Sequence, residues 1–138
     1  MEIIDPTIAK EKYNNINHLT NKVDWQLWVN FINKHSDYFI WSEETEKGKQ
    51  TIANLDKVPE HFREKLLEGH NKRKAYAEYN QKKGYYEIVV QYNKEYGVIS
   101  TTFMKPIREY HFQILLDMSK YLDAYLLNNG GQILEVYN

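Results

Sequence analysis

Apolar positions in the N-terminal third of the chain follow helical and strand-like patterns in turn. Residues 24–34 begin with a potential capping aspartate, and their apolar residues recur at spacings of three and four, which predicts a helix with one buried face. Asp5-Pro6 has the form of a helix start, with a capping residue followed by proline in the first turn. The aromatic run Tyr38–Trp41 favours a strand. We therefore expect two helices followed by a strand.

The next segment separates into a polar stretch and a short amphipathic one. Residues 42–57 are charged, small and weakly patterned, which indicates a long mobile loop. Pro59 then stands where a third helix would begin, Phe62 and Leu66 would share its apolar face, and Gly69 is placed to end it. This part of the chain is expected to add one helix.

Three strand-like runs, 72–79, 85–92 and 98–104, follow one another with short connections. The first connection ends in Gly84 and the second in Gly97, and each begins with asparagine, as hairpin turns with one left-handed residue commonly do. Antiparallel pairing of successive runs predicts a three-strand meander.

The C-terminal part combines a long helical repeat with a short tail. From Pro106 to Leu126, apolar residues recur at helical spacing over about five turns. Residues 128–131 are rich in asparagine and glycine and should end that helix, after which 132–137 could form a final strand. The predicted order is ααβαβββαβ. It gives an α+β fold in which an antiparallel or mixed sheet packs against N-terminal helices and a long C-terminal helix.

Composition adds bounds to this picture. A chain of 138 residues, 42% hydrophobic and 27% charged, fits one globular domain spanning residues 1–138. No cysteine is present, so disulfides and thiolate chemistry are excluded. The N-terminus lacks the pattern of a signal peptide, and no apolar run approaches the roughly 20 residues needed to span a bilayer. A cytoplasmic protein outside the membrane is expected.

Tyrosine is the most informative residue type. The chain has 12 tyrosines, and seven of them lie between Tyr76 and Tyr110, around the predicted meander. A phenol ring is apolar in its body and can form a hydrogen bond at its tip, so such rings suit half-buried sheet faces and contact surfaces. The pattern predicts a docking surface on the sheet.

Candidate catalytic chemistry is sparse. The chain has no recognised cofactor loop, activated nucleophile or zinc spacing among its five dispersed histidines, so no cofactor or metal is expected. His111 lies on the apolar stripe of the last helix and is expected to be a hydrogen-bonded core histidine. Glu78, Glu87 and Glu109 could converge in space, although glutamates on strands usually face solvent. A deep pocket with converging histidine and carboxylate groups would favour an enzyme.

The leading hypothesis from the sequence is therefore a noncatalytic protein-binding module. Glu43, Glu44 and Glu46 form an acidic cluster directly after Trp41, and Tyr85 could add a further aromatic contact. Such a surface would attract a basic partner by charge and bury an aromatic side chain against it. A small bacterial immunity or antitoxin-like protein, which covers the active surface of a basic toxin, is one concrete form of this hypothesis.

Three alternatives remain open at this stage. A nucleic-acid-binding protein would stack bases on Tyr85, Tyr86 or Tyr96, and its phosphate contacts would come from one basic set: Lys72, Arg73, Lys74, Lys82 and Lys83. A small-ligand enzyme or carrier would use a cleft between the sheet and the helices, lined by tyrosines with His111 or His61, and a filled interior would argue against it. Pairing of the edge strand 132–137 with another copy would give a homo-oligomer.

Overall fold

The computed structural model describes residues 2–67 and 70–137, and it confirms the α+β class. Seven strands form one antiparallel sheet in the order β2-β3-β4-β5-β1-β6-β7. The strands are β1 Pro6–Ala9, β2 Phe39–Trp41, β3 Lys74–Asn80, β4 Tyr85–Asn93, β5 Val98–Phe103, β6 Tyr125–Asn128 and β7 Gln132–Ile133. The predicted meander is β3-β4-β5, and both of its turns use a glycine in the left-handed region, Gly84 and Gly97. Those local turn signals were therefore sufficient to predict it.

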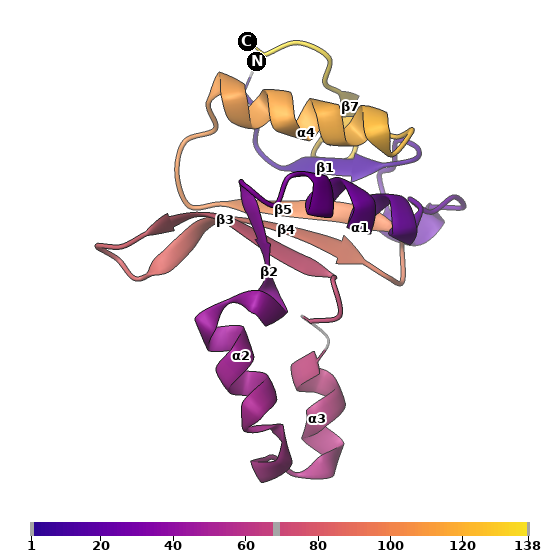
Figure 1. Ribbon diagram of the computed structural model, residues 1–138. Coiled ribbons are helices and arrows are strands. Elements are labelled where there is room, and N and C mark those ends of the chain that lie inside the picture. Colours follow the sequence, from indigo (N-terminus) through magenta and orange to yellow (C-terminus); the bar gives the residue numbers. More distant parts are fainter. Residues whose placement is uncertain (1, 68–69, 138) are drawn as a thin grey trace.

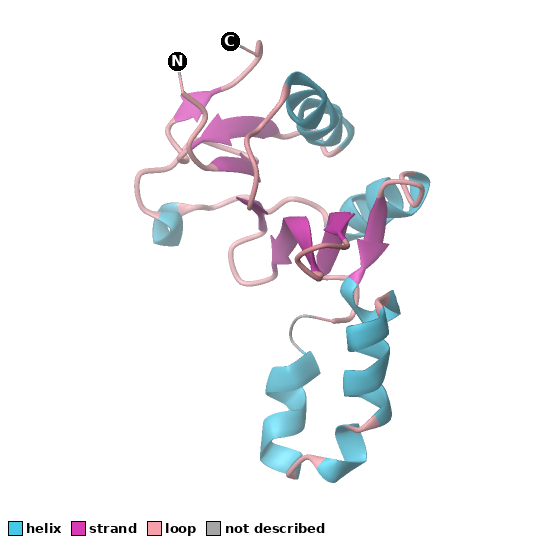
Figure 2. Cartoon of the chain, turned by 90° about the vertical axis from the view of Figure 1, so that its left-hand side faces the viewer, coloured by secondary structure: helices cyan, strands magenta, loops and turns pink. Residues whose placement is uncertain are grey.

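The helices fall into two groups. They are α1 Trp25–Lys34, α2 Glu46–Ala53, α3 Glu60–Leu67 and α4 Glu109–Tyr121. The chain also forms three single-turn 3₁₀ segments, η1 Ile16–His18, η2 Ser42–Glu44 and η3 Leu55–Lys57. Figure 1 shows α1 and α4 together on one side of the strands, whereas α2 and α3 project from the other side. Figure 2 shows the same projecting pair from a second direction. None of the helices in the described part of the chain has the length and apolar character needed to cross a membrane.

The core lies between the sheet and the layer formed by α1 and α4. Trp28 is fully buried there, with its ring edge-on to that of Trp41 at 5.8 Å between centroids, and its Nε1–H donates to the Lys72 carbonyl at 2.8 Å. The buried Tyr92 hydroxyl donates to the Val23 carbonyl at 2.7 Å. Even the polar atoms of these large aromatics are thus satisfied. Packed side chains fill this interior, which argues against a ligand cleft between the sheet and these two helices.

The first predicted helix is wrong, because residues 6–9 form strand β1 in the interior of the sheet. All four residues of β1 are buried, and the strand pairs on one side with β5 and on the other with β6. A capping aspartate followed by proline favours a helix only weakly. Two backbone ladders and complete burial outweigh that preference, and both depend on strands from the C-terminal half of the chain.

The last predicted helix is confirmed in its central part but is too long at both ends, since α4 begins at Glu109 and not at Pro106. Helix α4 ends at Tyr121, Asp123 takes a left-handed conformation with φ of 51°, and Tyr125–Asn128 becomes β6. Leu126 is buried in β6 and also fits the helical spacing, so that spacing alone did not reveal the switch. The expected final strand 132–137 shrinks to the two residues of β7. The sequence order of helices and strands differs accordingly from the predicted ααβαβββαβ.

The predicted loop at 42–57 is also wrong, because it folds as η2, α2 and η3. Thr45 caps α2, and its side-chain oxygen accepts a hydrogen bond from the Gly48 amide at 3.0 Å. The predicted third helix is confirmed as α3, and Gly69, its expected end, lies outside the described residues. We call residues 42–67 the arm. The arm buries little, since α3 has no buried residue and Ile52 and Phe62 are 43% and 50% exposed.

Gly48 tests the packing at the base of the arm. A methyl group at this position would lie 1.9 Å from the Ser42 carbonyl oxygen, so Gly48→Ala should destabilise the protein by about 1 to 3 kcal/mol. Alanine normally stabilises a helix by about 1 kcal/mol relative to glycine, so a loss would identify the clash. Urea unfolding measures the change. The control is Gly131→Ala, which meets no atom within 4 Å and should shift stability by less than about 0.5 kcal/mol.

Candidate functional site

The site begins with a break in the β3–β4 ladder at Glu78. Glu78 has φ of 59°, and backbone pairing is recorded on both sides of it but not at Glu78 itself. Strand alternation would place Tyr79 and Tyr86 on the core face. Their rings instead gather with Tyr76 on the other face, at centroid distances of 4.9 Å for Tyr79–Tyr86 and 5.2 Å for Tyr76–Tyr86. Beyond the left-handed Glu78, the side chains that strand alternation would place on the core face therefore lie on the opposite face of the hairpin. We call this the face exchange.

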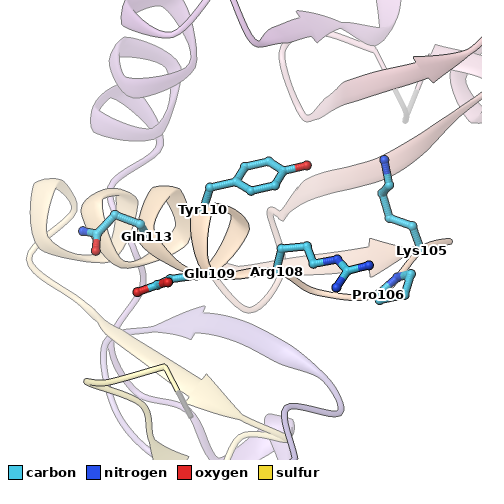
Figure 3. A pocket seen from close by; sticks show the side chains of 6 residues that line it. All are labelled: Lys105, Pro106, Arg108, Glu109, Tyr110 and Gln113. Carbon is cyan, nitrogen blue, oxygen red and sulfur yellow. The ribbon is translucent and has the colours of Figure 1, made fainter.

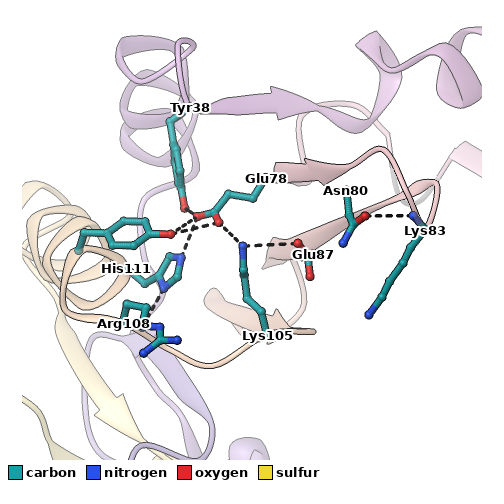
Figure 4. A network of polar contacts seen from close by, with 9 residues as sticks. Tyr38, Glu78, Asn80, Lys83, Glu87, Lys105, Arg108 and His111 are labelled. Atoms are coloured by element: carbon teal, nitrogen blue, oxygen red, sulfur yellow. Dashed lines mark hydrogen bonds and ion pairs between the residues drawn. The ribbon is translucent and has the colours of Figure 1, made fainter.

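The same break turns the Glu78 carboxylate toward α4. Four side chains donate hydrogen bonds to it (Figure 4). Oε2 accepts from the Tyr38 hydroxyl at 2.5 Å and from His111 Nε2 at 2.7 Å, while Oε1 accepts from Lys105 Nζ at 2.6 Å. The Tyr110 hydroxyl lies 3.2 Å from Oε1. We call these five residues the Glu78 cluster.

A backbone contact fixes the proton position on His111. Its Nδ1 accepts the backbone N–H of Arg108 at 2.9 Å, which requires a lone pair on Nδ1 and places the ring proton on Nε2. The Nε2–H can then donate to Glu78. His111 is 1% exposed, so the expected hydrogen-bonded core histidine is confirmed.

These contacts stabilise the charged form of the carboxylate. Burial by itself would raise the pKa of Glu78, but hydrogen bonds from Lys105, Tyr38 and His111 outweigh burial and lower the pKa to about 2. Burial and the hydrogen bond to Glu78 raise the pKa of the Tyr38 hydroxyl. The Glu78 hydrogen bond also raises the pKa of Lys105. A carboxylate with so low a pKa and so many donors is a weak general base.

A pocket of about 960 Å³ adjoins the Glu78 cluster (Figure 3). Its lining residues are Lys105, Pro106, Arg108, Glu109, Tyr110 and Gln113. From the Glu78 cluster, only Lys105 and Tyr110 reach this pocket; Glu78 and His111 do not line it. Lys105 Nζ also lies 3.4 Å from Glu87. Histidine and carboxylate groups do converge, as an enzyme would need, but their reactive atoms are engaged with one another instead of facing the pocket.

A second concave surface lies between the arm and the β3–β4 hairpin, with a volume of about 730 Å³. We call it the groove. Its hairpin side carries four tyrosines, Tyr76, Tyr79, Tyr85 and Tyr86, and its other lining residues are Ser42, Thr45, Glu46, Lys47, Gly48, Thr51, Lys65, Leu66, His70, Lys74 and Gly84. Tyr79 and Tyr85 are 52% and 37% exposed. The face exchange at Glu78 brings Tyr79 and Tyr86 to this side.

The predicted acidic contact surface is only partly assembled. Trp41 is 3% exposed, and its Nε1–H donates to Asn33 Oδ1 at 2.9 Å, so it belongs to the core. Glu43 accepts the backbone N–H of Lys72 at 2.8 Å and thereby ties the arm to the start of β3. Glu44 and Glu46 are exposed. Glu46 and Tyr85 do line the same groove.

The predicted basic set is divided by the fold. Lys72, Arg73 and Lys74 lie at the start of β3, while Lys82 and Lys83 lie in the turn at its other end. The five residues therefore do not gather at one end of the meander. Of these five basic residues, Lys74 is the one that lines the groove, and it does so beside Tyr85 and Tyr86. Tyr96 lies in the β4–β5 turn, where its hydroxyl donates to Asn17 at 2.8 Å.

Several groove residues were missed from the sequence. Lys47, Lys65 and Tyr79 were not among the candidate residues. His70 was one of the five dispersed histidines without an assigned role, yet it is 8% exposed and its Nδ1 has no hydrogen-bond partner among the described residues. The cap at Thr45 was the one available local signal for α2. Nothing local predicted the left-handed conformation of Glu78.

Comparison of the chain with protein-family models, curated proteins and solved structures gave no match. Within residues 2–67 and 70–137, no group of three or more histidine, cysteine or acidic side chains is arranged to hold a metal ion. Functional inference therefore rests on the Glu78 cluster and the groove themselves.

The Glu78 cluster predicts a pH-dependent contribution to stability. A carboxyl group with its pKa lowered from 4.5 to about 2 stabilises the fold above pH 4.5 and loses that contribution as the pH falls toward 2. Glu78→Gln should therefore cost about 2 kcal/mol at pH 7. Urea unfolding of both proteins between pH 7 and pH 2 should show the difference shrinking over that window.

Glu135→Gln provides the matched control, because Glu135 is exposed and its side chain forms no ion pair with another described residue. It should leave stability unchanged at both ends of the pH range. A Glu78→Gln protein as stable as the wild type at pH 7, or a difference independent of pH, would contradict the assignment of a stabilising carboxylate.

Proposed function

We propose that this chain is a noncatalytic protein-binding module and that the groove is its contact surface. The observation that carries the proposal is the four tyrosines gathered on one concave face opposite the arm. Tyrosine is enriched at protein contacts because its ring buries a large apolar area while its hydroxyl finds a polar partner. Tyr79 and Tyr85 are exposed enough to be covered by a partner.

The arm supports the same proposal. Leu66 lines the groove and is 41% exposed, and the arm also leaves Ile52 and Phe62 exposed. Exposed apolar side chains beside a concave aromatic surface favour a protein interface, since a partner can cover both at once.

The Glu78 cluster favours a binding module over an enzyme. Its carboxylate accepts four side-chain hydrogen bonds, and its histidine is satisfied at both ring nitrogens. A catalytic base needs a pKa near its working pH and access to a substrate. The cluster instead links β3 to α4 and holds the hairpin that carries the groove tyrosines.

A toxin-neutralising immunity or antitoxin-like protein remains one possible form of this module. The expectation of a basic toxin depends on Glu44 and Glu46, since Glu43 is engaged by the Lys72 backbone. We retain occlusion of a partner's surface as the proposed mode of action and place it at the groove. The cytoplasm is the proposed location, in keeping with a chain that lacks cysteine.

Nucleic-acid binding is the second candidate, because Tyr85, Tyr86 and Lys74 share the groove. Two features weaken it. Tyr86 already stacks on Tyr76, which occupies ring faces that bases would need, and the remaining basic residues lie at both ends of the hairpin. A homo-oligomer through the C-terminal edge would have only the two-residue β7 to pair with.

A crosslinking experiment tests the contact surface. Tyr85 is replaced by the photo-crosslinking residue p-benzoylphenylalanine, and the protein is irradiated in an extract of its native host. We expect an adduct with a particular protein, which is identified by mass spectrometry and purified. The purified protein should bind the wild type in solution, and Tyr79→Ala with Tyr85→Ala should weaken binding at least about tenfold, as hot-spot tyrosines do.

Tyr125 supplies the control, because it is 46% exposed but lies on β6 outside the groove. The crosslinker at position 125 should not give the same adduct, and Tyr125→Ala should leave the affinity unchanged. Equal adducts from both positions, or equal binding by all the tyrosine variants, would refute the groove as the contact surface.

A further inference from the structure

We infer that the groove binds an acidic segment of the partner protein, one that carries both carboxylate and apolar side chains. This inference rests on the proposed function and specifies the chemistry of the segment. It reverses the charge expected from the sequence, where the acidic cluster pointed to a basic partner. The reversal follows from the side chains that the fold brings to the groove.

Positive charge in the groove comes from three separate elements. Lys47 lies on α2, Lys65 on α3 and Lys74 on β3, whereas Glu46 is the only acidic side chain among the described residues that line the groove. No ion pair is recorded for these three lysines in the described part of the chain. Unpaired lysines surrounding a concave surface favour an anionic ligand, by attraction during approach and by charge-assisted hydrogen bonds afterwards.

The groove also presents apolar surface, which favours apolar side chains in the bound segment. Tyr79 and Tyr85 present ring area on the hairpin side, and Leu66 presents an aliphatic side chain on the arm side. A partner that offered only charged side chains would leave these apolar surfaces exposed to water. A segment that carries both acidic and apolar side chains can place apolar groups on the tyrosines and on Leu66 and carboxylates on the lysines.

Other occupants fit less well. A nucleic acid strand supplies anionic charge, but it has no aliphatic side chains to pack on Leu66. A second copy of this chain would need an exposed acidic segment, whereas Glu43 of its own acidic cluster is engaged by the backbone N–H of Lys72. Both occupants are therefore made outcomes of the test.

The experiment selects binders from a phage-displayed library of random peptides on the full-length protein. Two proteins are used in parallel: the wild type and a charge-reversed variant carrying Lys47→Glu, Lys65→Glu and Lys74→Glu. We expect wild-type selections to enrich peptides that contain both acidic and apolar residues. The charge-reversed variant should lose them, and a synthetic peptide from the wild-type selection should bind the variant at least about tenfold more weakly.

Two further proteins separate charge from folding. The first carries Lys12→Glu, Lys94→Glu and Lys120→Glu; these lysines are exposed and outside the groove, so it has the same net charge as the reversed variant and should retain the acidic peptides. The second carries glutamine at positions 47, 65 and 74, and should bind with intermediate affinity. Thermal melting of all the variants verifies that each is folded.

The outcomes distinguish this inference from the proposed function. Enriched peptides whose binding requires Tyr79 and Tyr85 but shows no acidic bias would overturn the acidic segment and leave the groove as the contact surface. Enriched peptides that bind the Tyr79→Ala, Tyr85→Ala protein equally well, or no enrichment at all, would overturn both.

Two direct measurements cover the other occupants. A thymidine oligonucleotide that binds the wild type but not the charge-reversed variant, with an affinity that falls steeply as salt rises, would replace the acidic segment by nucleic acid. Sedimentation that shows a wild-type dimer, lost on Tyr79→Ala with Tyr85→Ala, would identify a second copy as the occupant. We expect neither result.

Discussion

The left-handed backbone of Glu78 determines which side chains lie on each face of the β3–β4 hairpin. A residue with a side chain loses roughly 1–2 kcal/mol in this conformation, so it persists only where its surroundings stabilise it. Here the carboxylate receives four hydrogen bonds, which offset that cost. The same rotation carries Tyr79 and Tyr86 away from the core face and toward Tyr76. One strained residue thus closes a polar cluster on one side of the sheet and builds an aromatic surface on the other.

The Glu78 cluster thus has a structural role, which is to hold the hairpin in place. Tyr38 precedes β2, Lys105 follows β5, and His111 lies in α4, so the carboxylate holds three separate parts of the fold against β3. Binding costs less when the contact side chains are already held in place, because less conformational freedom is lost on association. The Glu78 cluster supplies such support from the opposite face of the hairpin that carries the groove tyrosines.

The arm completes the groove by a different physical route. Its helices are defined mainly by local features, such as the cap at Thr45 and the close approach of Gly48 to the Ser42 carbonyl. They bury little apolar surface of their own, and α3 has no buried residue. Helices with so little tertiary burial contribute little to the stability of the core and leave their side chains available for contacts. The groove therefore has one wall that is held in place by the Glu78 cluster, the hairpin, and one wall that buries little apolar surface, the arm.

Local signals were enough to predict the α+β class, helix α1 with its Asp24 cap, and the meander with left-handed glycines at 84 and 97, because they act between residues close together in the chain. It also placed His111 correctly, as a polar residue within an apolar stripe. Three features could not be predicted in this way: the strand at residues 6–9, the departure of residues 125–128 from the helix, and the exchange of hairpin faces at Glu78. Each of these depends on partners from distant parts of the chain. Local propensity differs between conformations by about 1 kcal/mol or less per residue, so long-range pairing and burial override it.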